Sequence, residues 1–533
     1  MDVIAPRITT DRSTATHSLE AIVAGVCRAG MGDEEKAVAL YEYTRRVMFH
    51  YRQRSERLDE HFDLDPLRLI NTYGYSFCTQ QMMVLVALWQ AAGIESKVWG
   101  MPGHGTAQAF YGGKHHWFDP LIGAYVRSRK VSHLHFAHSR HVPNEDVTPV
   151  ASLAEIAEDP TVLTKAAAEG RAAPTFLPCG RVFYEDVARL VPTMADYIRQ
   201  CDALGDDMGF IAARAGQSRP TWNPRQPLYQ PDWPLRVGER VVFLWKNLDG
   251  EYNCIGVNPE HLPPHHWCGV EVDKKDKLNY PYWKPYAKTI NGVRTCRYHA
   301  NGLHDFAPSF RDEWFKRGFE ANSFEWHRRK RGMPKLRLKR RGRAANLVYK
   351  MSTPHVYTSA TLAADFRRAA REDASRLYVS CDGGAKWTNV WDAKAQRAPG
   401  AGDGSGKVKA KVELRDPVRG MRDFWVRAEC RTRGEPDKAG IDSLAIRAVF
   451  QHNMFARPHL VPGRNRITVC VANSEVLPRV GFDVTYAWRE GRAARSHTER
   501  IAESPATFTI RVGGKELPRM LRLEMNVGKG GST

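Results

Sequence analysis

Apolar residues recur at intervals of three and four after Cys78, on a face formed by Met82, Leu85, Val86, Trp89 and Ala92. The turn-prone segment 73–76 precedes this stretch and Gly93 follows it. Glycine adopts the left-handed conformation that ends many helices. The pattern therefore predicts a helix with a buried face that begins near Cys78. A thiol at a helix N-terminus lies near unpaired N–H groups and the positive end of the dipole, which favour the nucleophilic thiolate.

Two strand-like segments follow the predicted helix. Residues 95–100 form a first alternating run, and His104 opens a second that extends to Tyr111. Gly112 and Gly113 then supply a hairpin turn, after which the chain returns through residues 116–119 to Asp119. Antiparallel pairing would bring His104 and Asp119 side by side. An imidazole held by a carboxylate and facing a thiol is the arrangement of a nucleophile, its base and the residue that orients the base.

This order of residues resembles the transglutaminase-like superfamily over roughly the first 130 residues. The shared features are a cysteine opening a helix that ends in Ala-Ala-Gly-Ile, a histidine opening a strand, and an aspartate in a Trp-x-Asp-Pro setting. The resemblance implies an α+β, papain-like fold with Cys78 as nucleophile, His104 as base and Asp119 as orienting acid. Thr106 departs from the pattern, since the superfamily usually has an aromatic residue there. The reaction stays open, because members crosslink amides, cleave peptides or glycan amides, or are inactive.

Other roles for these residues remain open. Cys78 alone also suits a core position. His115 and His116 compete for the role of base, but they precede Asp119 on the same strand and cannot face it across a hairpin. A metal site built from the three histidines and Asp119 lacks helical or Cys-x-x-Cys spacing. We therefore expect no metal and no cofactor.

The remaining chain changes from helical to strand-like patterns. Proline-rich residues 219–234 read as a linker, residues 236–245 alternate like a strand, and short β-patterned runs continue from Asn346. The predicted fold class is α+β, with β-rich domains after the N-terminal domain. The expected divisions are a catalytic domain (1–150), a helical connection and linker (151–234), a β-rich domain (235–345), and a carbohydrate-binding-like β-sandwich (346–533).

One C-terminal motif resembles the Asp-box of sialidase-like proteins. The matching residues are Ser380, Asp382, Gly384 and Trp387, with Lys386 where threonine is usual. The resemblance implies a structural hairpin rather than a site. Because the box is common in extracellular carbohydrate-active proteins, we expect an extracellular or periplasmic location, although residues 1–7 show no apolar core of signal-peptide type.

Charge and aromatic residues narrow the expected partners. The 533 residues include 79 Lys and Arg against 59 Asp and Glu, a net charge of +20 that favours polyanionic partners. The densest basic run spans 328–343, and no nucleic-acid recognition motif lies beside it, so acidic polysaccharide is preferred to nucleic acid. Tyr282 and Trp283 lie in an aromatic cluster at 280–286 that suits sugar rings, or equally a core patch. No run is long enough to span a bilayer.

These observations predict an extracellular cysteine enzyme that transfers or hydrolyses acyl groups of a glycoconjugate or peptidoglycan-type amide. Its oxyanion would be held by the backbone N–H of Cys78 and by Gln80, and its substrate by Trp117, Tyr282 and Trp283. One alternative is a polysaccharide lyase or glycosidase acting on acidic polysaccharide. Another is a non-catalytic glycan-binding protein.

Overall fold

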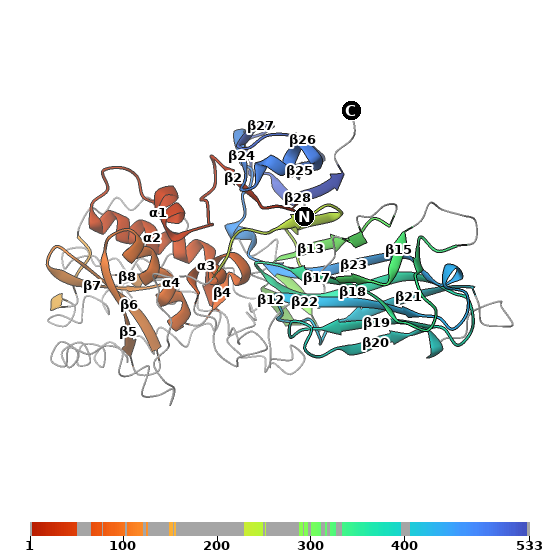
Figure 1. Ribbon diagram of the computed structural model, residues 1–533. Coiled ribbons are helices and arrows are strands. Elements are labelled where there is room, and N and C mark those ends of the chain that lie inside the picture. The colour runs from red at the N-terminus through yellow and green to blue at the C-terminus, as the bar shows by residue number, and fades with distance from the viewer. Residues whose placement is uncertain are drawn as a thin grey trace.

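The computed structural model describes residues 3–50, 65–76, 78–101, 104–120, 124–125, 149–152, 154–155, 229–248, 251, 287–290, 293–296, 300–310, 315–316, 320–326, 333–395 and 406–529. Helices gather at one end of the molecule and a larger β region fills the other (Figure 1). Both ends of the chain lie on one side of the β region, beside the strands drawn in blue.

The helical end is a layer of helices packed on a four-stranded antiparallel sheet. The helices are α1 (Leu19–Val26), α2 (Asp33–Val47), α3 (Pro66–Arg68), the π-helical turn η1 (Leu69–Tyr73) and α4 (Cys78–Ala91). The sheet has the order β5 (Glu95–Met101), β6 (His104–Tyr111), β7 (Lys114–Asp119), β8 (Ala124–Tyr125). A short parallel pair joins β3 (Phe49–His50) to β4 (Tyr75–Ser76). Helix α4 lies centrally, in contact with α1, α2, β5 and β6.

Local signals account for the ends of these elements. The Ser18 hydroxyl accepts a hydrogen bond from Ala21 N (3.0 Å) and so caps α1. At the other end of α4, Gly93 has a φ of +83° and Ile94 N donates to Trp89 O (2.9 Å). This is the closure expected of a glycine after a helix. The predicted helix from Cys78 to Gly93 and the hairpin at Gly112 and Gly113 are therefore confirmed.

A ten-stranded antiparallel sheet dominates the β region. Its main path has the order β15 (Phe324–Trp326), β16 (Leu336–Leu338), β23 (Gly440–His452), β13 (Ala300–Phe306), β10 (Glu239–Leu244), β28 (Arg519–Lys529), β25 (Val480–Glu490), β26 (Ala493–Ile501). Off this path, β18 (Val356–Arg368) pairs with β23 and with β21 (Gly406–Leu414). The sheet therefore combines strands that precede residue 345 in the sequence with strands that follow it.

A five-stranded sheet covers one face of the ten-stranded sheet. Its order is β14 (Glu320–Asn322), β17 (Ala345–Ser352), β22 (Asp423–Arg431), β19 (Ala374–Ser380), β20 (Thr388–Asp392). Aromatic pairs join the two layers, with ring centroids 5.1 Å apart for Tyr357 and Phe424 and 5.4 Å apart for Phe366 and Trp391. The main hydrophobic core lies between these sheets.

Smaller sheets tie distant parts of the chain together. Strand β2 (Pro6–Thr10) pairs with β24 (Gly463–Val471), which pairs in turn with β27 (Ala506–Val512). Two-stranded pairs join β1 (Val3–Ile4) to β9 (Leu235–Arg236) and β11 (Ala287–Ile290) to β12 (Val293–Cys296). Short 3₁₀ turns are η4 (Ala393–Ala395), η5 (Pro436–Lys438), η6 (Met454–Ala456) and η7 (Ser474–Arg479).

The predicted fold class was wrong. The chain is mostly β and is built from curled antiparallel sheets, with no clear α+β papain-like domain. The helices sit on a small sheet at one end, and most strands pair over long sequence distances in the β region. A local motif of one helix and two strands predicted those elements but not the architecture around them.

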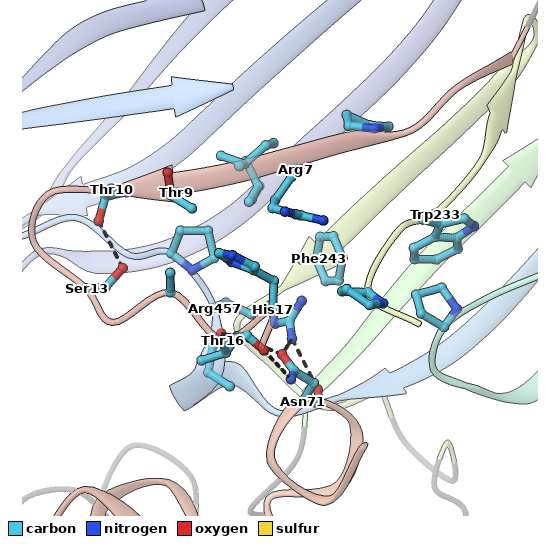
Figure 2. Close-up of a pocket in the computed structure, with 18 of the residues that line it drawn as sticks. Arg7, Thr9, Thr10, Ser13, Thr16, His17, Asn71, Trp233, Phe243 and Arg457 are labelled. Carbon is cyan, nitrogen blue, oxygen red and sulfur yellow. Dashed lines mark hydrogen bonds between the residues drawn. The ribbon is translucent and has the colours of Figure 1, made fainter. Parts of the chain in front are cut away.

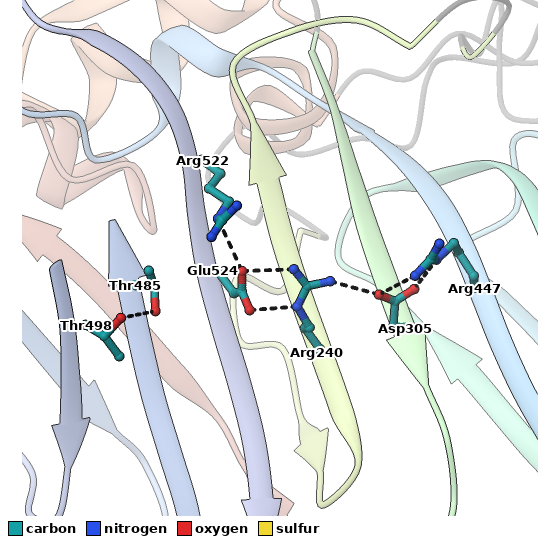
Figure 3. A network of polar contacts seen from close by, with 7 residues as sticks. All are labelled: Arg240, Asp305, Arg447, Thr485, Thr498, Arg522 and Glu524. Carbon is teal, nitrogen blue, oxygen red and sulfur yellow. Dashed lines mark hydrogen bonds and ion pairs between the residues drawn. The ribbon is translucent and has the colours of Figure 1, made fainter. Parts of the chain in front are cut away.

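An ion-pair ladder crosses the ten-stranded sheet from β28 to β23 (Figure 3). Arg240 makes two bonds to Glu524, from Nε to Oε1 (2.6 Å) and from Nη2 to Oε2 (2.9 Å). Its Nη1 donates to Asp305 (3.0 Å), which also accepts from Arg447 Nε (2.7 Å). The hydrogen bonds to Glu524 are the largest cause of the raised pKa of Arg240. Cross-strand pairs of opposite charge favour this strand order.

Candidate functional site

The turn before Cys78 is held by the β region. Gly74 follows η1 with a φ of +67°, and a Cβ at this position would lie 2.6 Å from the side chain of Asn453. Asn453 Nδ2 donates to Val47 O (2.9 Å) and Ile70 O (2.7 Å). One buried amide thus connects the end of α2, the turn η1 and the 3₁₀ turn η6, and this fixes where α4 begins.

Helix α4 is held at both ends. Gln81 Nε2 donates to Ser76 O (3.3 Å), which ties the first turn to the residue before the helix. Near the C-terminus, Trp89 is fully buried and its Nε1 donates to Ala37 O of α2 (3.1 Å). Its ring centroid lies 5.1 Å from that of Phe118 on β7, so the helix packs on the sheet.

The sheet brings the backbones of His104 and Asp119 to the same end. His104 pairs with Met101 at the β5–β6 turn, and Ala107 pairs with Phe118 between β6 and β7. One step further along this register, Asp119 stands opposite residue 106, two positions from His104. Asp119 is therefore not paired directly with His104, and contact between their side chains stays a prediction.

Strand alternation separates two sides of this sheet. Positions 104 and 119 fall on one side, whereas Ala107 and Phe118 fall on the other, where Phe118 meets Trp89 of α4. Contact of Cys78 with His104, and of His104 with Asp119, stays a prediction.

The other predicted residues near this sheet are enclosed. Gln80 and Trp117 are each 2% exposed. His116 is also buried: its ring stacks on Tyr111 with centroids 3.8 Å apart, and its Nδ1 lies 3.0 Å from Val150 O. Burial lowers the pKa of His116. These contacts give His116 a structural role, while Tyr282 and Trp283 lie outside the described residues.

Sequence reasoning missed a buried polar cluster on the ten-stranded sheet. Glu239 accepts from Arg236 Nε (3.1 Å) and lies 3.3 Å from His304 Nε2. The other His304 nitrogen, Nδ1, lies 2.9 Å from the hydroxyl of Tyr357. Burial opposes the Glu239 carboxylate, but the charge of Arg236 and the hydrogen bond from His304 lower its pKa to about 2. The members are buried and contact one another inside the core, so we assign the cluster to stability.

The Asp-box residues form a closed hairpin between β19 and β20. Ser380 Oγ donates to Asp382 Oδ1 (2.8 Å) and accepts from Gly384 N (2.9 Å), while Lys386 N donates to Asp382 Oδ1 (2.9 Å). The Lys386 N–H is the largest cause of the lowered pKa of Asp382. These bonds stay within the turn, which suits a structural hairpin.

Part of the basic run is built into the ten-stranded sheet. Leu336 and Leu338 of β16 are buried, at 0% and 1% exposure. Arg337 between them pairs with Glu325 (3.1 Å) and Asp437 (2.9 Å). At this point the run is locally neutralised. Residues 327–332 lie outside the described part of the chain.

Two kinds of feature are absent from the residues that the structure describes. These residues contain no group of three or more His, Cys, Asp or Glu placed to hold a metal ion. They also contain no helix with the length and apolar character needed to cross a membrane. The predictions about cofactors, partners and location remain predictions.

Comparisons with known proteins give little guidance. No family model matches the chain, and no curated protein matches it. Among solved structures, the pilus backbone of Streptococcus pneumoniae is 9% identical over 35% of this chain and 73% of that one, with a TM-score of 0.09. A β-glucuronidase of Parabacteroides merdae is 11% identical over 54% of this chain and 35% of that one, with a TM-score of 0.11. These scores are too low to identify a class of protein or a particular relative.

Proposed function

We propose that the protein is a cysteine-dependent acyl-transfer enzyme that uses Cys78, His104 and Asp119. The observation that carries the proposal is positional. Cys78 is the first residue of α4, and positions 104 and 119 lie near the same end of adjacent strands in the sheet that α4 packs against. The sequence order resembles the transglutaminase-like superfamily, and this adds support for the chemistry.

The chemistry follows from these three groups. The Cys78 thiolate attacks the acyl carbon, and the C–N bond of the amide breaks as His104 gives its proton to the departing amine. A thioester remains on Cys78. Water or a second amine then attacks the thioester, His104 accepts its proton, and Cys78 leaves as the thiolate, which restores the starting thiolate–imidazolium pair. Asp119 keeps the imidazole in the required tautomer and stabilises its charged form.

We propose a glycoconjugate or peptidoglycan-type amide as the substrate, handled outside the cell or in a periplasm. The excess of basic residues, 79 against 59, suits a substrate embedded in acidic polymer. In this proposal the backbone N–H of Cys78, the first residue of α4, stabilises the oxyanion, with Gln80 as a neighbouring donor. The test of Cys78 as the nucleophile does not depend on the proposed substrate or on the proposed oxyanion donors.

The test is the pH dependence of Cys78 alkylation by iodoacetamide, read by peptide mapping in the full chain. An ordinary thiol titrates near about 8.5, so an activated Cys78 should react at lower pH than this. Two described cysteines provide references in the same sample, because Cys470 is exposed and Cys430 is buried. Burial raises the pKa of Cys430, so we expect it to stay unmodified.

Two variants separate the parts of the proposed triad. His104→Ala should return Cys78 to ordinary reactivity, while Asp119→Asn should weaken the low-pH reactivity without abolishing it. Cys470 should react alike in all three proteins. If Cys78 titrates like Cys470 in the wild type, the proposal is refuted. Cleavage of acidic polysaccharide by a Cys78→Ala variant would instead establish a lyase or glycosidase, and glycan binding without turnover a binding protein.

A further inference from the structure

A pocket lies where the N-terminal segment crosses the β region (Figure 2). Strand β2 and residues 13–17 form one wall. The opposite wall comes from η1, the chain around residues 229–233, β10 and the chain after η6, with Asn71, Tyr229, Trp233, Phe243 and Arg457. Segments more than 400 residues apart in the sequence thus enclose one space.

The charge of this pocket is cationic. Its cationic lining residues are Arg7 and Arg457, since burial lowers the pKa of His17 and of His355, and its described lining residues include neither Asp nor Glu. Arg7 pairs with Asp232 (2.7 Å), but that carboxylate is not part of the lining and its side chain is 46% exposed. The two arginines attract anions, while Asp232 pairs with Arg7, and both Asp232 and Glu20 act on His17.

Four buried nitrogen atoms around the pocket have no hydrogen-bond partner among the described residues. They are Arg7 Nε, His17 Nδ1, Trp233 Nε1 and Arg457 Nε. Buried polar nitrogens are usually satisfied by protein, water or ligand. Four unsatisfied nitrogens on residues that line one pocket indicate a binding site for a hydrogen-bond acceptor. A carboxylate is an acceptor with two oxygens and about four lone-pair sites.

Arg457 is held in position for such an acceptor. Its Nη2 donates to Asn71 O (3.4 Å) and forms a short hydrogen bond with Asn71 Oδ1. Its guanidinium carbon lies 5.2 Å from the centre of the Phe243 ring. Arg457 also shares a hydrogen bond with Tyr229, whereas its Nε has no hydrogen-bond partner among the described residues. Burial lowers the pKa of Arg457, which is the cost of keeping a cation here without a carboxylate partner.

Aromatic residues supply the apolar part of the wall. Tyr229, Trp233 and Phe243 are each 3–5% exposed, and the rings of Trp233 and Phe243 meet edge to face with centroids 6.2 Å apart. Thr9, Ser13 and Thr16 add hydroxyl groups on the N-terminal wall. A pocket with apolar walls, hydroxyls and an anion-binding side suits a hydroxylated ring that carries an acid.

We propose that this pocket binds a ring-bearing carboxylate, the chemistry of a uronic acid unit in an acidic polysaccharide. The carboxylate accepts from Arg7 and Arg457, and the apolar face of the ring lies against Trp233 and Phe243. This binding does not depend on the Cys78 thiol, so a test of carboxylate binding is independent of the test of acyl transfer.

The test measures binding of glucuronate to the full chain by calorimetry and saturation-transfer NMR. Glucose is the uncharged counterpart of the same ring, and inorganic phosphate is an anion without a ring. We expect glucuronate to bind and glucose and phosphate to bind at least tenfold more weakly. Absence of glucuronate binding, or equal binding of glucose, overturns the proposal. Equal binding of phosphate overturns the ring-bearing part and leaves a general anion site.

Two variants on the N-terminal wall locate the binding. Arg7→Gln should weaken glucuronate binding at least tenfold, because its side chain is 40% exposed and its loss should leave the fold intact. Arg12→Gln is the matched control, since Arg12 follows on the same segment outside the pocket. Thermal unfolding checks that both variants fold. If Arg7→Gln folds and binds as the wild type does, glucuronate is bound elsewhere.

His17 adds a pH signature. Burial and the charge of Arg7 lower its pKa, against smaller opposing effects of Asp232 and Glu20. A bound carboxylate would raise that pKa, so glucuronate should bind more tightly as pH falls from 7 to 5.5. His17→Gln should remove the larger part of this dependence. Unchanged pH dependence in His17→Gln would exclude His17 from the binding site.

Discussion

His452 should make the protein sensitive to acid, because it is buried as a neutral imidazole. It is 0% exposed at the end of β23, and its Nε2 lies 3.1 Å from Leu244 O, so this nitrogen carries the proton. Its ring meets Phe243 edge to face, with centroids 5.1 Å apart. Burial, helped by the charge of Arg457, lowers the pKa of His452 from 6.5 to about 3.

The sign and size of the effect follow from proton linkage. A histidine whose pKa is lower in the folded state takes up a proton on unfolding at pH values between the two pKa values. Stability is therefore full above the unfolded pKa and falls as pH drops toward the folded pKa. With values of 6.5 and about 3, His452 alone should cost about 2 kcal/mol between pH 7 and pH 5.

The assay is urea unfolding at pH 7 and pH 5, for wild type and His452→Gln. Glutamine keeps a donor for Leu244 O but does not titrate. The variant should lose about 2 kcal/mol less than the wild type between the two pH values. His497→Gln is the control for replacing a histidine by glutamine, because the His497 side chain on β26 is 36% exposed and lies outside the core. Equal losses in wild type and His452→Gln would refute the reasoning.

Three glycine substitutions test backbone strain and packing by urea unfolding. Gly74→Ala should cost about 2–4 kcal/mol, since it combines left-handed strain of roughly 1–2 kcal/mol with displacement of Asn453. Gly93 also has a left-handed backbone, but an added Cβ there would meet no atom within 4 Å. Gly93→Ala should therefore cost only the strain of roughly 1–2 kcal/mol. Gly302→Ala places a Cβ 2.0 Å from Phe450 Cζ and should cost about 1–3 kcal/mol, relieved by Phe450→Leu. A neutral Gly302→Ala, or equal effects at positions 74 and 93, would contradict these contacts.

Local signals in the sequence predicted the elements around Cys78 correctly. Helix α4 has apolar residues at helical spacing and a closing glycine at Gly93, and both signals lie within 16 residues. The β6–β7 hairpin is determined by Gly112 and Gly113, with φ values of +59° and +73°. Such features are decided by neighbours in the chain, so one sequence contains the information needed to predict them.

The architecture could not be predicted in the same way, because it depends on distant pairing. Alternation in residues 239–244 predicts a strand but does not identify its neighbours. In the structure, Val241 of β10 pairs with His304 on one side and with Met525 on the other. The alternating pattern of one strand does not indicate that it pairs with a strand more than 280 residues away. The α+β prediction failed because one local motif was extended to a fold class.

The cationic pocket was missed for the same reason. Arg7, His17, Trp233 and Arg457 are ordinary residues in their own segments. No short sequence motif joins the segments that form the two walls of the pocket. Their proximity depends on pairing of β2 with β24, which brings the N-terminus to the C-terminal strands. The useful sequence signal was only the excess of basic residues, and it does not say where those residues gather.

The two candidate sites meet at Asn71, and this determines which substitutions can distinguish them. Asn71 lies in η1, and its carbonyl accepts from Asn453 N (2.9 Å), whose side chain occupies the space beside Gly74 before α4. Asn71 also accepts from Arg457 in the pocket. Replacing Arg457 would therefore disturb the turn that positions Cys78 as well as the pocket. Arg7 lies on the opposite wall without a contact to that turn among the described residues, so its loss reports on the pocket alone.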